Sequence, residues 1–196
     1  MKYVPNAITI GRIVVTPILL VFLFWDTLVG QGAALVLFIL AAISDYFDGK
    51  LARSLGARSR LGQFLDPMAD KVLVLGTFTA LAFLIPVVVP WWAVALIALR
   101  DVVVTTLRMW AESKGRTMRT IPMAKTKTTL QLVFLIGILV MLTARHLPGT
   151  LAEIAIWVLQ SVIPFILLMA VVALTLFTGL WYLFNKDYVS PAQFNH

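Results

Sequence analysis

Four aspartates stand at helical spacing within one short stretch of the chain. Asp45 and Asp48 are three residues apart, and Asp66 and Asp70 are four apart, so each pair shares a face if its segment is helical. Two antiparallel helices joined by a short loop would bring the pairs together. Clustered carboxylates repel one another, and Mg²⁺ or Mn²⁺, which prefer oxygen ligands, would offset that repulsion. The spacing therefore predicts a site for two metal ions of the kind that supports phosphoryl transfer.

Small residues and an arginine accompany these aspartates. Gly49 and Ala52 continue the face of the first pair and, with Gly62, would leave room for a flat group, while Arg53 could contact a phosphate. The alternative is that the glycines pack or cap helices and the charges meet lipid headgroups. Four aspartates on successive helices favour the metal site. Asp66, which precedes a proline, could also cap a helix.

The composition indicates how these residues are held. The chain of 196 residues is 61% hydrophobic and 13% charged, with a mean hydropathy of +0.95, whereas soluble domains carry about 25% charged residues. We interpret it as an integral membrane protein with one domain, residues 1–196, whose apolar N-terminal segment is retained. The absence of cysteine excludes disulfides, thiolate metal sites and a cysteine nucleophile.

A helix that crosses a bilayer needs about 20 mostly apolar residues. Six stretches are predicted to cross the membrane: 8–25, 33–55, 66–85, 91–109, 125–144 and 154–184. The last of them is predicted to be divided near Pro164, because proline interrupts a helix. The predicted fold class is therefore all-α, a polytopic membrane protein with six transmembrane helices and an active site at the cytoplasmic side of the bundle.

The distribution of basic residues predicts the orientation. If both termini are cytoplasmic, all but two of the 16 lysines and arginines lie at the cytoplasmic ends, since only Arg145 falls in an outer loop and Arg100 within a span. Such asymmetry follows the positive-inside rule. The net charge of +7 then favours anionic lipids and substrates at the inner face, and nothing indicates nucleic-acid binding.

The aspartate region resembles a known signature. Asp45-x-x-Asp48-Gly49-x-x-Ala52-Arg53, eight further residues, and Gly62-x-x-x-Asp66-x-x-x-Asp70 match the CDP-alcohol phosphotransferases at every defined position. The resemblance implies six transmembrane helices, a homodimer, and transfer of a phosphatidyl or similar group from a CDP-linked donor to an alcohol. It also implies that the four aspartates bind the metals, that Asp70 is the general base, and that Gly49, Ala52, Arg53 and Gly62 line the pocket for cytidine diphosphate.

The first residues and two later segments bear on the substrates. The opening "VPNAITIGR" resembles the start of bacterial phosphatidylglycerophosphate synthases, which would place Asn6 and Thr9 near the nucleotide. Asn6 could equally cap the first helix.

The later segments, "ALRDVVVTTLR" and "AKTKTTLQ", resemble regions of the same synthases in which basic residues hold the phosphate of sn-glycerol 3-phosphate. This likeness assigns that role to Arg100, Arg108, Lys125 and Lys127. Asp101 stands where the family usually has glutamate, and Ala124 where it usually has glycine. Arg100 could instead form a structural tie with Asp101, and Arg108 could extend to the membrane surface.

The expected reaction is transfer of the phosphatidyl group from CDP-diacylglycerol to sn-glycerol 3-phosphate, in the bacterial inner membrane. A cardiolipin synthase of the same family is the closest alternative because its acceptor is also anionic. An inositol-phosphate transferase is another, and a serine transferase would need less positive charge. A transporter or channel would spread its charges through the bilayer rather than gather them on one side, and a scaffold would give no reason for the aspartates.

Overall fold

The computed structural model describes residues 4–55, 60–114, 116–118, 122–184 and 189–191. This part of the chain is helical apart from two short strands. The elements, in chain order, are α1 (Val4–Phe24), α2 (Leu28–Leu55), α3 (Arg60–Leu84), α4 (Trp91–Ser113), β1 (Arg116–Met118), α5 (Pro122–Ala144), α6 (Thr150–Gln160), α7 (Ile163–Phe184) and β2 (Val189–Pro191).

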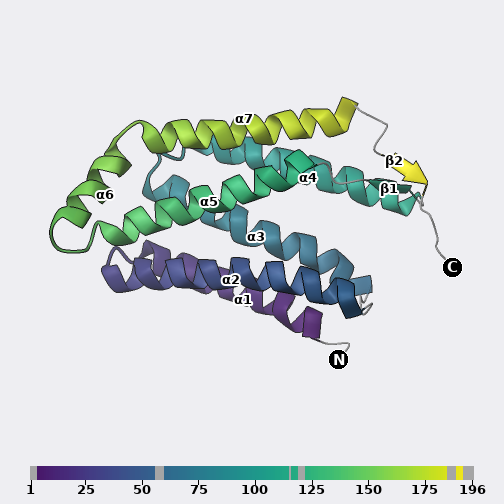
Figure 1. Ribbon diagram of the computed structural model, residues 1–196, viewed down its shortest axis with the longest axis horizontal. Helices are drawn as coiled ribbons and strands as arrows, with labels where there is room; N and C mark the ends of the chain where they lie inside the picture. The colour runs from purple at the N-terminus through teal and green to yellow at the C-terminus, as the bar shows by residue number, and fades with distance from the viewer. Residues whose placement is uncertain (1–3, 56–59, 115, 119–121, 185–188, 192–196) are drawn as a thin grey trace.

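The long helices form two groups that meet where α2 and α3 face α5 and α4 (Figure 1). In one group α1 packs against α2 and α3, and in the other α7 packs against α4 and α5. α5 also contacts α2, and the stacked rings of Phe78 and Phe134, 5.9 Å apart, join α3 to α5. The short helix α6 connects α5 to α7 at one end of the bundle. The end of α2, the start of α3 and the two strands all lie at the opposite end of the bundle, the strands beyond the end of α4 (Figure 1).

Apolar side chains cover the outside of the bundle, and polar ones lie inside it. Large exposed residues include Val21, Val36, Phe83, Leu99 and Val133. Among the side chains that the structure describes, the buried polar ones are Arg12, Thr16, Gln31, Thr77, Asp101, Lys127, Gln131, Thr175 and Thr178. Six threonine hydroxyls donate to the carbonyl four residues earlier: those of Thr16, Thr77, Thr79, Thr105, Thr106 and Thr143. Hydroxyls satisfied within their own helix suit an apolar environment.

Two helical segments of the described chain are long and apolar enough to cross a membrane, Thr126–Ala144 and Ile163–Phe184. Shorter apolar segments occur at Gly11–Phe24, Leu28–Ser44, Lys71–Leu84 and Thr150–Gln160. The helices predicted from the sequence are all present, and the long final stretch divides as expected, with Pro164 in the first turn of α7.

Several helix boundaries differ from the predicted ones. α2 begins five residues early, at Leu28, because the hydroxyl of Thr27 accepts a hydrogen bond from the backbone N–H of Gly30 and caps the helix. α3 begins at Arg60, so Asp66 lies inside the helix and the alternative that it is an N-cap is wrong. Asn6 is not an N-cap either, because α1 already begins at Val4.

The antiparallel strand pair was not anticipated. β1 precedes α5, β2 follows α7, and Thr117 pairs with Ser190 at the centre of the register. Strands of three residues carry too little alternation to be recognised in a sequence. Their pairing ties the segment between α4 and α5 to the chain after α7.

Candidate functional site

The backbone places all four predicted metal ligands near one end of the bundle. Asp45 and Asp48 lie in the last three turns of α2, and Asp66 and Asp70 lie in the first three turns of α3. Their side chains lie outside the described part of the structure. The same is true of the other predicted residues Asn6, Thr9, Gly49, Ala52, Arg53, Gly62 and Lys125.

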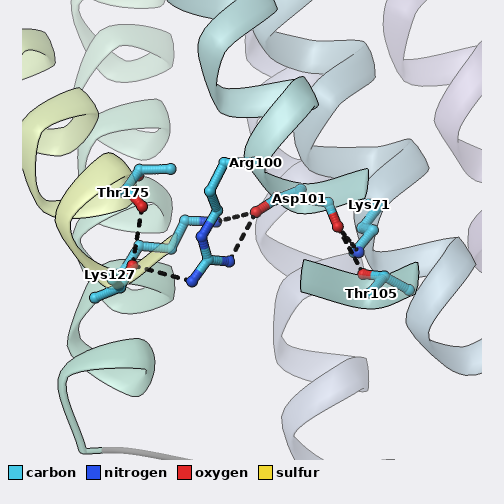
Figure 2. A network of polar contacts seen from close by, with 7 residues as sticks. Lys71, Arg100, Asp101, Thr105, Lys127 and Thr175 are labelled. Atoms are coloured by element: carbon cyan, nitrogen blue, oxygen red, sulfur yellow. Dashed lines mark hydrogen bonds and ion pairs between the residues drawn. The ribbon is translucent and has the colours of Figure 1, made fainter. Parts of the chain in front are cut away.

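The predicted basic residues Arg100 and Lys127 converge on one carboxylate. The Lys127 ammonium, from α5, donates to Oδ1 of Asp101 at 2.7 Å, and a terminal nitrogen of Arg100 donates to the same oxygen at 3.1 Å. The side chains of Lys127, Asp101 and Arg100 are only 5%, 9% and 11% exposed. Figure 2 shows them meeting between α4, α5 and α7. The structure thus brings together two of the four residues predicted to bind the acceptor phosphate, together with Asp101.

A lysine that the sequence analysis did not assign to the site joins the same cluster. The Lys71 ammonium donates to the backbone oxygen of Asp101 at 2.7 Å, and the hydroxyl of Thr105 donates to the same oxygen at 2.7 Å. Lys71 directly follows Asp70 on α3, so the contact links the aspartate helix to α4. Its place beside a predicted ligand was the only signal in the sequence that could have found it.

The fourth helix of the cluster is α7. The second terminal nitrogen of Arg100 donates to the hydroxyl of Thr178 at 3.0 Å, and that hydroxyl donates to the backbone oxygen of Thr175 at 3.0 Å. We call the cluster the Asp101 network: Lys71, Arg100, Asp101, Thr105, Lys127, Thr175 and Thr178 (Figure 2).

Gly179 provides the space that Arg100 needs beside α7. A Cβ atom added to Gly179 would lie 2.7 Å from Cγ of Arg100, close to the backbone end of that side chain. We therefore expect Gly179→Ala to push α7 from α4 and to lower the free energy of unfolding by roughly 1–3 kcal/mol. Thermal unfolding in detergent would measure the change. Gly137→Ala is the matched control, because a Cβ there meets nothing within 4 Å. Equal melting temperatures for the two variants would contradict the expectation.

Arg108, the third predicted basic residue in this region, is half-buried on α4. It lies eight residues after Arg100, which corresponds to about 12 Å along a helix. Since α4 runs toward the end that holds the start of α3 and β1 (Figure 1), Arg108 lies nearer to that end than the Asp101 network does. None of the contacts described above for the network involves Arg108, which has partners of its own.

A second polar cluster lies at the other end of the bundle, near α6. Arg145 donates to the carboxylate of Asp26, and Nε2 of His146 lies 3.2 Å from the same oxygen and 3.0 Å from the amide of buried Gln31. A cavity of about 1060 Å³, walled by residues such as Phe165, opens beside it. None of the predicted site residues lines this cavity.

The metal hypothesis depends on the donor set of α2 and α3. Within the described ranges, which leave out the side chains of the four aspartates, no group of three or more acidic or histidine side chains could hold a metal ion. Four carboxylates on two successive helices supply the hard oxygen ligands that Mg²⁺ and Mn²⁺ require. The residue types therefore fit such ions.

The chain belongs to the CDP-alcohol phosphatidyltransferase family, whose sequence pattern it matches over residues 2–181. It is accordingly an enzyme, of a family of polytopic membrane proteins that act in phospholipid synthesis.

The chain is also similar to individual members of the family that share one name. The chain is 35% identical over 159 residues to the CDP-diacylglycerol–glycerol-3-phosphate 3-phosphatidyltransferase of Cereibacter sphaeroides, covering 79% of this chain and 71% of that protein. It is 33% identical to the Bacillus subtilis enzyme of the same name, over 81% of this chain and 88% of that one. The Escherichia coli enzyme of that name is also 33% identical, over 69% and 76% of the two chains.

Proposed function

We propose that the protein transfers the phosphatidyl group of CDP-diacylglycerol to sn-glycerol 3-phosphate, giving phosphatidylglycerophosphate and CMP. The names of the relatives support both substrates. The structural observation that supports the choice of a phosphorylated acceptor is the convergence of three cationic side chains on Asp101, beside α3.

The cationic side chains come together in the Asp101 network. Among the described residues, the network contains three cationic groups, those of Lys71, Arg100 and Lys127, and one carboxylate, that of Asp101. Clustered lysine and arginine side chains suit a phosphate, because hydrogen bonds between ionised partners are strong. An acceptor that carries a phosphate therefore fits this cluster better than serine, which has no net charge.

The four aspartates form the donor side of the proposed site. Asp45, Asp48, Asp66 and Asp70 would hold two Mg²⁺ or Mn²⁺ ions, which would supply positive charge for the diphosphate and the departing CMP. The hydroxyl oxygen of sn-glycerol 3-phosphate attacks the β-phosphorus while Asp70 accepts the hydroxyl proton. The bond between that phosphorus and the oxygen of CMP breaks, and CMP leaves. The remaining residues on this side line the nucleotide pocket: Asn6, Thr9, Gly49, Ala52, Arg53 and Gly62.

The basic residues of α4 and α5 form the acceptor side. Arg108 and Lys125 bind the phosphate of sn-glycerol 3-phosphate, with Arg100 and Lys127 as partners deeper in the bundle. The contact from Lys71 to α4 supports this arrangement, because it joins the helix of the general base Asp70 to the helix of Arg108. Acceptor hydroxyl and acceptor phosphate would then be held by adjoining helices.

The remaining parts of the proposal concern the protein in its membrane. The chain crosses the bacterial inner membrane six times with both termini in the cytoplasm, and it acts as a homodimer. The charge asymmetry supports this orientation.

An acceptor comparison tests the proposed function. Purified enzyme would be given CDP-diacylglycerol, Mg²⁺ and one acceptor at a time: sn-glycerol 3-phosphate, inositol 1-phosphate, phosphatidylglycerol or serine. We expect CMP release and a lipid product chiefly with sn-glycerol 3-phosphate. Faster turnover of phosphatidylglycerol would instead make the protein a cardiolipin synthase, and turnover of serine would remove the argument from the cationic network.

A further inference from the structure

Asp101 joins α4 to three other helices, directly or through Arg100. Its carboxylate receives Lys127 from α5 and the neighbouring Arg100, and its backbone oxygen receives Lys71 from α3. Through Arg100 and Thr178 the same residue is connected to α7. Four helices therefore meet at one residue of α4 (Figure 2).

The carboxylate restricts both cations that it contacts. A lysine ammonium on a four-carbon chain has many rotamers, and fixing one of them costs conformational entropy. The 2.7 Å bond to Asp101 selects one position for Lys127, whose side chain is 5% exposed. Arg100 is held from two sides, by Asp101 and by Thr178, with Gly179 making room for its stem.

We propose that Asp101 is a positioning residue for the acceptor: its carboxylate fixes the Lys127 ammonium and the Arg100 guanidinium in the orientation that receives the acceptor phosphate. This inference rests on the proposed function. It assigns Asp101 no contact with the substrate. It explains why an acidic side chain lies among cations that are proposed to attract an anion.

Electrostatics alone would give Asp101 the opposite effect. A carboxylate beside Lys127 and Arg100 lowers the positive potential that an incoming phosphate meets, and so weakens its binding. Neutralising Asp101 would then tighten acceptor binding. If orientation dominates, neutralising Asp101 weakens acceptor binding instead. The sign of the change in KM therefore distinguishes positioning from simple charge balance.

The test is the kinetics of Asp101→Asn, which keeps the shape of the side chain and removes its charge. We expect the KM for sn-glycerol 3-phosphate to rise about tenfold, a typical effect of breaking coupled charged contacts, while the KM for CDP-diacylglycerol stays the same. Asp101→Glu, which retains the carboxylate, should recover much of the loss. Thr106→Val is the matched control, because it removes an equivalent bond to the backbone oxygen of Val102, outside the network, and it should leave the acceptor KM unchanged.

A double variant tests whether the effect passes through Lys127. In a Lys127→Met background, Asp101→Asn should raise the acceptor KM by much less than it does alone, because its partner is already absent. Full additivity of the two changes would overturn the proposal. So would an unchanged or lower acceptor KM in Asp101→Asn itself. A lower melting temperature with an unchanged KM would show that Asp101 serves stability alone.

A replacement variant and the wild-type kinetics distinguish failure of the positioning role from failure of the proposed function. If Asp101→Asn does not fold, Asp101→Ser, which also removes the carboxylate, takes its place, and the same rise in the acceptor KM is expected. If the wild-type enzyme does not use sn-glycerol 3-phosphate, the proposed function fails. If the wild type uses it and Asp101→Asn keeps its KM, only the positioning role fails.

Discussion

Replacing Asp70 with asparagine is expected to reduce the transferase rate by roughly a hundred- to ten-thousandfold, the range typical for loss of a general base. The change keeps the size of the side chain but removes the charge that accepts the hydroxyl proton and helps to hold a metal ion. Asp66→Asn should be similarly inactive because it removes a proposed ligand. Formation of labelled phosphatidylglycerophosphate from labelled sn-glycerol 3-phosphate would measure both.

Metal removal provides the companion experiment. Excess EDTA should abolish turnover by the wild-type enzyme, and Mg²⁺ or Mn²⁺ should restore it, because clustered carboxylates need a dense counter-charge. Asp26→Asn is the matched control for the variants Asp70→Asn and Asp66→Asn, since this exposed aspartate lies at the α6 end of the bundle and pairs with Arg145. Its activity should equal that of the wild type. Undiminished turnover in EDTA would contradict the two-metal hypothesis.

The second large effect is expected at the acceptor phosphate. Arg108→Ala and Lys125→Ala should each raise the KM for sn-glycerol 3-phosphate by roughly ten- to a hundredfold, because a charge-assisted hydrogen bond contributes about 1.5–3 kcal/mol. The KM for CDP-diacylglycerol and the affinity for metal should change little. Initial-rate measurements with each substrate varied in turn would separate these constants.

Arg145→Ala is the control for that experiment, because it removes an arginine from the opposite end of the bundle. It should leave both KM values unchanged. If Arg108→Ala and Lys125→Ala lose CDP-diacylglycerol binding and keep the acceptor KM, the basic residues serve the donor. The choice of sn-glycerol 3-phosphate would then depend on the relatives alone.

Much of the fold follows from local sequence features. Long apolar stretches predict helices because only helices satisfy the backbone in an apolar environment, and Pro164 correctly marked the division between α6 and α7. Helix starts were less predictable. Thr27 caps α2, which therefore begins earlier than predicted. α3 also begins early, at Arg60, so that polar residues resembling a loop belong to the helix. Hydropathy detects the apolar core of a helix and not its polar turns.

The candidate site was predictable where its residues form a local pattern. The spacing from Asp45 to Asp70 required no tertiary information, and the pairing of Arg100 with Asp101 was foreseen as an alternative. Contacts between distant segments were not foreseen. Thr178 lies 78 residues from Arg100, and Lys71 lies 30 residues from Asp101. A threonine in an apolar helix has no distinguishing signal, because most such hydroxyls only bond to their own backbone.

The connection of Arg100 to Thr178 also has a consequence for biosynthesis. Ribosomes add about 5–20 residues per second, so α7 emerges on the order of ten seconds after α4. Under the proposed topology, α4 must enter the bilayer with Arg100 and Asp101 before α5 and α7, which carry Lys127 and Thr178, have entered it. Each such charge adds about 2.5–3.5 kcal/mol to the cost of insertion at a helix centre. During this interval the charges of the adjacent Arg100 and Asp101 can neutralise each other. Either residue alone would leave an unneutralised charge in the bilayer until α5 and α7 had been inserted.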